Sequence, residues 1–247
     1  MSAPSRPEPP APMLFLHGGG VSAWMWQPVL DLLDPSWAPE VPDLPGHGAR
    51  WQEAYRSHRA TTAELAEWIQ RAHPEGVHVT GFSLGAQLAI LLASEHPELV
   101  RSATVVSAET IPAPAPRSTL ALLAASAPLA RRPGFARAQA RQLGVPAALT
   151  EAYVADSARL SKASLLNSVG ENIRFTLPAE WSAYPGPVAV VVGSRERRLM
   201  RNSAELTHRT LPGSALHTIP GAGHDVPLTQ PEALVSILHQ TRARATS

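Results

Sequence analysis

The sequence predicts an α/β protein with a mostly parallel, doubly wound sheet and a helical segment inserted into that core. Three observations lead to this prediction. Short apolar runs alternate with helical patterns, each run is apolar at successive residues, and one long stretch between two runs lacks any strand pattern. Continuous apolar runs are typical of strands covered on both faces, as in a parallel sheet. With 247 residues, of which 44% are hydrophobic, the chain is long enough for one large domain.

The expected strands and helices follow one another along the chain. The strands are expected at residues 13–17, 77–82, 103–107, 188–192 and 216–219. Helices are expected at 62–72, with Thr61 or Thr62 as the N-cap, at 84–94, and at 232–240 after Pro231 in the first turn. The 84–94 segment is apolar on nearly all sides, as expected of a helix buried against a sheet. This alternation places helices on both faces of an open sheet.

Residues 111–184 are expected to be a helical insertion. No strand pattern occurs there, and three helix-like stretches (119–130, 135–144 and 146–169) are separated by Pro or Gly. The core is then formed by residues 13–110 and 185–247. The insertion is either a lid or a packing layer, and the motifs on either side of it favour a lid. Residues 1–12 are rich in proline without an apolar run, which predicts a flexible tail and not a signal peptide.

Composition narrows the possible partners. The net charge is +1, so there is no basic excess for nucleic acid or for an anionic membrane. No apolar stretch approaches the ~18 residues that a membrane span needs. The absence of cysteine excludes disulfides, thiolate metal sites and a cysteine nucleophile. We therefore expect a cytoplasmic protein, monomeric or homodimeric, that acts on a small molecule.

The segment Gly81-Phe82-Ser83-Leu84-Gly85 fits the pattern G-x-S-x-G. The pattern alone is weak, but here it follows a strand-like run and opens a helix-like one, which is the context that a nucleophile on a strand-to-helix turn requires. The alternative is a structural serine in an ordinary turn. We expect Ser83 to be a nucleophile, with the N–H of Leu84 available to a developing oxyanion.

Three further motifs complete a candidate site. "HGGG", residues 17 to 20, ends the first strand and exposes backbone N–H groups, or is merely a flexible turn. His224 lies between the last strand and the last helix, where a neutral imidazole can accept the serine proton. Glu196 follows the fourth expected strand and is a candidate to orient His224, or else belongs to a solvated charge cluster with the neighbouring arginines. Glu109, after the third expected strand, is the alternative acid.

Together these motifs resemble those of α/β-hydrolase fold proteins. The order Ser83, Glu196, His224 is that family's nucleophile–acid–histidine order, and "PDLPGHG" (residues 42 to 48) and "PGAGH" are similar to two of its loops. The resemblance runs from Leu14 to about Leu238. It implies an oxyanion hole formed by the N–H groups of Gly19 and Leu84, and a helical cap at residues 111–184. The acid position more commonly holds Asp, so the choice between Glu196 and Glu109 stays open.

We therefore expect a serine esterase that forms an acyl-enzyme on Ser83, without cofactor or metal. Gly18 and Trp24 are expected to contact a small to medium, largely apolar acyl group, although Trp24 also fits the role of a core anchor. The alternatives are a C–C bond hydrolase, a lactonase or a perhydrolase with the same triad. A ligand-sensing protein with little turnover is the alternative from another class.

Overall fold

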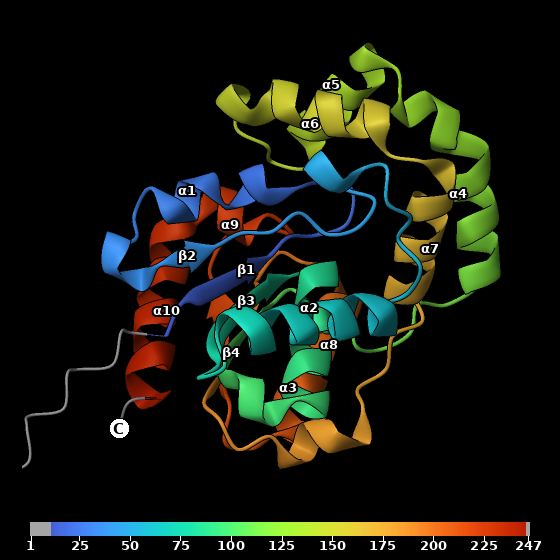
Figure 1. The fold of residues 1–247 in the computed structure, drawn as a ribbon. Coiled ribbons are helices and arrows are strands. Elements are labelled where there is room, and N and C mark those ends of the chain that lie inside the picture. The colour runs from blue at the N-terminus through green and yellow to red at the C-terminus, as the bar shows by residue number, and fades with distance from the viewer. Residues whose placement is uncertain (1–10, 246–247) are drawn as a thin grey trace, which may run out of the picture.

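The computed structural model describes residues 11–245 and contains one six-stranded sheet (Figure 1). The strands are β1 (Met13–Leu16), β2 (Pro39–Glu40), β3 (Val77–Phe82), β4 (Val100–Val106), β5 (Val188–Gly193) and β6 (Ala215–Ile219). Their order is β2-β1-β3-β4-β5-β6, and each neighbouring pair is parallel. The five predicted strands are present, and the predicted α/β class is confirmed.

Helices cover both faces of this sheet. One face carries α2 (His58–Ala72), α3 (Leu84–Glu95) and α8 (Arg198–Thr210), and the other carries α1 (Gln27–Leu30), α9 (Val226–Thr229) and α10 (Pro231–Ala245). Successive strand residues face opposite sides: Leu14 and Leu16 pack on the side of α3, Met13 and Phe15 on the side of α10. This alternation between two apolar layers explains why the strands read as continuous apolar runs.

Short 3₁₀ helices occupy several connections. Their bounds are η1 (Ala23–Trp26), η2 (Pro35–Trp37), η3 (Gly48–Arg50), η4 (Pro97–Leu99), η5 (Ala147–Leu149) and η6 (Ala179–Ala183). The sequence does not predict four elements of the core: β2, which is only two residues long, the four-residue helices α1 and α9, and α8, which begins within an arginine-rich segment.

The predicted start of α2 is wrong. The helix begins at His58, and the Oγ of Ser57 caps it by accepting the N–H of Ala60 at 3.1 Å. Thr61 and Thr62 lie inside the helix and are buried, and the Oγ of Thr61 donates to the Ser57 carbonyl. An N-cap serine with its oxygen free for the first turn is favoured over a threonine whose hydroxyl bonds backward.

The helical insertion contains four helices rather than three. These are α4 (Pro116–Ala130), α5 (Pro133–Gln142), α6 (Thr150–Arg159) and α7 (Lys162–Asn172), and residues 111–184 contain no strand. The predicted stretch 146–169 divides at Leu160, because Ser161 starts a new helix by accepting the N–H of Ser164. Figure 1 shows α4 to α7 arching along the side of the core that lies away from α10.

Most of the predicted tail, residues 1–10, lies outside the described residues. Ala11 and Pro12 are buried beside β1, and the Pro12 carbonyl accepts the N–H of His78 at 2.9 Å. Across residues 11–245, no helix combines the length and the apolar character needed to cross a bilayer.

Candidate active site

Ser83 lies on a strained turn between β3 and α3. Its backbone has φ 54° and ψ −113°, a region that residues with side chains rarely occupy. A side chain is excluded at both flanking glycines: an added Cβ would lie 2.1 Å from the Gly85 carbonyl oxygen if built on Gly81, and 2.1 Å from the Leu16 carbonyl oxygen if built on Gly85. The two glycines are therefore required by the close approach of α3 to β1 and β3.

His224 and Glu196 form a hydrogen-bonded chain with Ser83. The Nε2 of His224 lies 3.2 Å from the Ser83 Oγ, and its Nδ1 lies 2.8 Å from the Glu196 Oε2. The His224 ring also contacts Phe82, at 5.0 Å between ring centroids. Since a carboxylate only accepts hydrogen bonds, Nδ1 carries the ring proton and Nε2 is left to accept one from Ser83.

Glu196 is held by three donors. Its side chain is fully buried, and Oε1 accepts the Ser107 Oγ–H at 2.6 Å and the Gly193 N–H at 3.0 Å. Burial by itself would raise the pKa of this carboxyl. The hydrogen bond and the charge of His224, followed by the bonds from Ser107 and Gly193, outweigh burial and lower the pKa below its ordinary value. Glu196 is therefore an anion at neutral pH.

Glu109, the alternative acid, does not reach the ring in this way. Its Oε1 is buried without a hydrogen-bond partner among the described residues, and burial raises the pKa of its carboxyl, although the charges of Arg197 and His224 oppose that effect. Glu109 therefore lies near His224, while the contact with Nδ1 belongs to Glu196.

Gly19 and Leu84, the predicted oxyanion-hole residues, line the same cavity as Ser83. Leu84 is the first residue of α3, so its N–H has no acceptor in a preceding helical turn. A Cβ built on Gly19 would lie 3.6 Å from the Leu84 Cδ1, and both residues line the same cavity as Ser83. Both residues therefore lie at the serine end of the cavity, and their role as oxyanion donors stays a prediction.

The loop that carries Gly19 is held by residues of the "PDLPGHG" segment. The Oδ1 of Asp43 accepts the Ala23 N–H at 2.8 Å and its Oδ2 accepts the Ala49 N–H at 2.7 Å. The His17 Nε2 accepts the Leu44 N–H at 2.9 Å. Burial lowers the pKa of His17 to about 3, so this imidazole is neutral and serves as a structural link.

A cavity of about 500 Å³ lies between Ser83 and the helical insertion. Its walls are mostly apolar and come from the Gly19 loop and from α4, α5, α6 and α7. They include Val21, Leu84, Leu123, Tyr153, Leu165 and Val169. Gly18 and Trp24, which the sequence predicts to contact substrate, are not among the lining residues. No group of three His, Asp or Glu side chains within residues 11–245 is arranged to hold a metal ion.

Trp24 joins the core to the insertion. Its indole N–H donates to the Asp156 Oδ2 at 2.7 Å, and its ring meets Tyr153 edge-on at 6.4 Å between centroids. Trp26 is fully buried and packs against Phe15. Both tryptophans thus have packing partners in the protein, and the site-lining aromatic ring is instead Tyr153 of α6.

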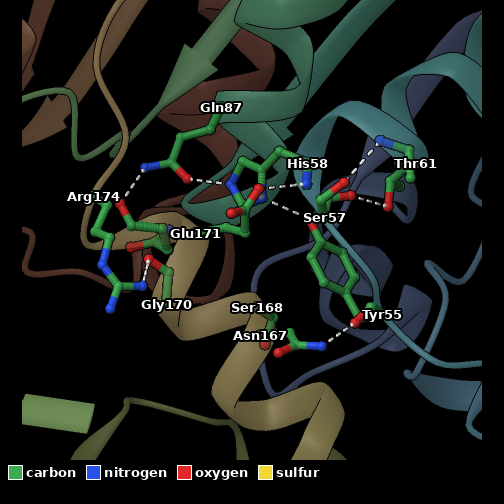
Figure 2. Close-up of polar contacts among 12 residues, drawn as sticks. Tyr55, Ser57, His58, Thr61, Gln87, Asn167, Ser168, Gly170, Glu171 and Arg174 are labelled. Atoms are coloured by element: carbon green, nitrogen blue, oxygen red, sulfur yellow. Dashed lines mark hydrogen bonds and ion pairs between the residues drawn. The ribbon is translucent and has the colours of Figure 1, made fainter. Parts of the chain in front are cut away.

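A buried polar network that sequence analysis missed connects α3 to the insertion (Figure 2). Gln87, one turn after Ser83, is fully buried, and its Nε2 donates to the Glu109 carbonyl at 2.6 Å and the Asn172 carbonyl at 3.1 Å. Its Oε1 accepts the Nε2–H of His58 at 2.7 Å, and the Nδ1 of His58 accepts the Tyr55 hydroxyl at 2.8 Å. The amide therefore ties the chain on both sides of α4 to α7 to the helix that carries Ser83. The signal for it was a lone glutamine in the apolar run of 84–94.

Comparisons with known proteins concern the family and the fold of this chain. The sequence profile described as the alpha/beta hydrolase family matches residues 13–237. The chain is 27% identical to an esterase of Mycobacterium tuberculosis, Esterase Rv0045c, over 92% of this chain and 80% of that protein. It is 33% identical to a pimeloyl-[acyl-carrier protein] methyl ester esterase of Yersinia enterocolitica, over 38% of this chain. That match spans about a third, 35%, of the relative's length.

Solved structures of low sequence identity share the fold. A thermophilic esterase from Thermogutta terrifontis superposes with a TM-score of 0.78 at 19% identity, over 96% of this chain and 91% of that one. The enol-lactonase from Burkholderia xenovorans LB400 superposes with a TM-score of 0.79 at 16% identity, over 94% and 92%.

Proposed function

The chain belongs to the alpha/beta hydrolase family, and we propose that it hydrolyses carboxylic esters through an acyl-enzyme on Ser83. The observation that carries the proposal is the hydrogen-bonded chain from the Ser83 Oγ through His224 to the buried Glu196. Relatives of this chain are named esterases, which supports ester hydrolysis as the reaction. The site residues act in two steps.

In the first step, the Ser83 Oγ attacks the ester carbonyl carbon while the His224 Nε2 takes the hydroxyl proton. The Gly19 and Leu84 N–H groups stabilise the oxyanion, at about 3 kcal/mol for each donor. The tetrahedral intermediate collapses as His224 gives its proton to the leaving alkoxide. The alcohol departs and the acyl group stays on Ser83.

In the second step, water attacks the acyl-enzyme. His224 takes a proton from that water, and the Ser83 oxygen leaves and regains its proton from His224, which releases the carboxylic acid. The His224 side chain is 41% exposed, so water has access to its ring. Glu196 stays ionised throughout and stabilises the imidazolium.

The helical insertion acts as the cap of this site in our proposal. Residues of α4, α6 and α7 line the cavity together with Ser83, and their apolar side chains suit an uncharged acyl chain next to the scissile bond. The Gln87 bonds to the carbonyls of Glu109 and Asn172 hold the cap to α3.

The test is hydrolysis of p-nitrophenyl esters from acetyl to decanoyl by the protein and by Ser83→Ala. We expect turnover by the wild-type protein and none by Ser83→Ala. The acyl chain length that gives the highest turnover indicates how long an acyl group the cavity holds. Ser94→Ala is a matched control, because Ser94 lies in the same helix and donates to a carbonyl of that helix, far from His224. Turnover retained by a folded Ser83→Ala variant would refute the nucleophile. Absence of turnover on every ester would favour the C–C hydrolase, lactonase, perhydrolase or sensing alternatives.

A further inference from the structure

We propose that the substrate is an ester whose end remote from the scissile bond carries negative charge, held by Arg131 and Lys162. The group is a carboxylate or a phosphate. This inference rests on the proposed function, since it takes Ser83 as the end of the cavity where the ester bond lies. It adds a binding subsite for the other end of the substrate.

The cavity extends from Ser83 along one face of α7. Its α7 lining residues are Asn172, Val169, Ser168, Leu165 and Lys162, a spacing of three to four residues that selects one side of a helix. Asn172 lies at the Ser83 end, because its carbonyl accepts the Gln87 amide one turn after Ser83. Lys162 is ten residues earlier, or about 15 Å along the helix at 1.5 Å per residue.

Arg131 lies at the same remote end. It follows α4 directly, and its guanidinium donates to the Leu160 carbonyl at 3.2 Å, just before Lys162 in the chain. Arg131, Leu160 and Lys162 all line the cavity. Figure 1 shows the end of α4 and the start of α7 at the same corner of the insertion. Two cations therefore close a cavity whose walls are otherwise mostly apolar.

Neither cation is neutralised within the protein. No carboxylate among the described residues forms an ion pair with Arg131 or Lys162, whereas Arg137 in the same insertion is paired with Glu151. Residues 111–184 hold eight Lys and Arg residues against four Asp and Glu residues, although the whole chain is close to neutral. The positive charge is thus concentrated in the segment that covers the cavity, and it attracts an anion to the end of the cavity where Arg131 and Lys162 lie.

A carboxylate or phosphate fits these two donors. Arg131 offers a planar fork and Lys162 a mobile ammonium group, which together suit several oxygen atoms on one anionic group. An apolar chain between the two ends would lie against Leu123, Leu165 and Val169. A neutral chain of the same length would leave both cations without an anionic partner, and an ammonium-ended chain would be repelled.

The test compares matched methyl esters that differ only at the remote end. They are monomethyl suberate with a carboxylate, methyl octanoate with a methyl group, methyl 8-aminooctanoate with an ammonium group, and methyl 8-phosphonooxyoctanoate with a phosphate. We expect KM for the suberate to be about tenfold below that for the octanoate, at about threefold for each exposed cation, with kcat little changed. The ammonium ester should have the highest KM, and the preference should shrink at high salt. A lower KM for the phosphate ester than for the suberate would identify phosphate as the natural group.

Variants of the two cations test whether they cause the preference for anionic esters. Arg131→Gln and Lys162→Gln together should abolish the preference for the anionic esters. Arg132→Gln should keep it, because Arg132 is an exposed neighbour that does not line the cavity. Equal KM values for the charged and neutral esters, or a preference that survives in the double variant, would overturn the inference and leave the esterase proposal intact.

A binding measurement tests this inference independently of the proposed function. The Ser83→Ala variant, studied by calorimetry, should bind monomethyl suberate about tenfold more tightly than methyl octanoate, with or without any catalytic role for Ser83. Esters that bind with this preference but are never hydrolysed by the wild-type protein would refute the esterase and support the anionic subsite. Equal binding of the two esters would refute the subsite.

Discussion

Replacing Glu196 by Gln tests whether the carboxylate sets the tautomer of His224. Three donors point at Glu196: His224 Nδ1–H, Ser107 Oγ–H and Gly193 N–H. A glutamine has a single acceptor oxygen, which can keep the Ser107 and Gly193 bonds at the Oε1 position. Its NH₂ group must then face His224. The imidazole proton moves to Nε2, and that nitrogen loses its ability to accept the Ser83 proton.

The expected loss follows from these contacts. A charge-assisted hydrogen bond contributes about 1.5–3 kcal/mol, which alone corresponds to a roughly 10- to 150-fold lower kcat. Because the tautomer is also wrong, we expect the decrease in kcat to approach about 10⁴-fold, the effect of converting a triad carboxylate to an amide. The volume is conserved and two of the three bonds remain, so the melting temperature should change little.

The assay is the steady-state hydrolysis of the best p-nitrophenyl ester, with thermal unfolding measured on the same preparations. Glu109→Gln is the matched control, since this carboxyl lies near His224 without the bond to Nδ1. It should lower kcat by no more than a few fold. A kcat for Glu196→Gln within about threefold of the wild type, or an equal loss in Glu109→Gln, would refute the reasoning.

Three further predictions concern the frame of the site. Gly85→Ala should destabilise the protein by about 3 kcal/mol or more, because the new Cβ would lie 2.1 Å from the Leu16 carbonyl oxygen. In the control Gly134→Ala the new Cβ meets no atom within 4 Å, so its melting temperature should equal that of the wild type; an unchanged melting temperature in Gly85→Ala would contradict the prediction. Gln87→Leu leaves two carbonyls and the His58 ring N–H without the amide that binds them, so we expect the free energy of unfolding, measured in urea, to fall by about 3–5 kcal/mol. A decrease below about 1 kcal/mol would argue against the network. Burial lowers the pKa of His17 from 6.5 to about 3, so between pH 6.5 and about 3 only the unfolded chain takes up this proton. In that range the His17 contribution should make the free energy of unfolding fall with decreasing pH by about 1.4 kcal/mol per pH unit; His17→Gln should lose this contribution, and identical pH slopes for the two proteins would refute the prediction.

Much of the fold could be predicted because its signals are local. The five longer strands appear as short apolar runs, and α3 as an apolar helix after a glycine-flanked serine. The turn at Ser83 is equally local, since Gly81 and Gly85 are required within two residues of it. The sequence predicts the start of α2 wrongly because Ser57 and Thr61 are both good caps, and only the backbone path decides which oxygen faces the first turn.

Neighbouring residues in the sequence do not show which of the two glutamates binds His224. Glu109 and Glu196 each follow a strand, and β4 and β5 are neighbours in the sheet, so both carboxyls arrive at the same edge. The loop after β5 turns back so that the Gly193 N–H and the Ser107 hydroxyl bind Glu196, and this leaves its second oxygen for His224. These partners come from the end of β5 and from the loops after β4 and β6, and their meeting depends on the packing of the sheet.

The sequence by itself determined the α/β class, the helical insertion and the serine and histidine of the candidate site, because periodicity, glycines and turns report on the nearest few residues. Only the tertiary structure decided which glutamate meets His224, that Gln87 joins α3 to the insertion, and that Arg131 and Lys162 share the remote end of one cavity. Those contacts join residues from 22 to 89 positions apart, or helices that meet only when the insertion folds over the core. Packing sets the side-chain geometry across such separations, and the periodicity of the sequence does not predict it.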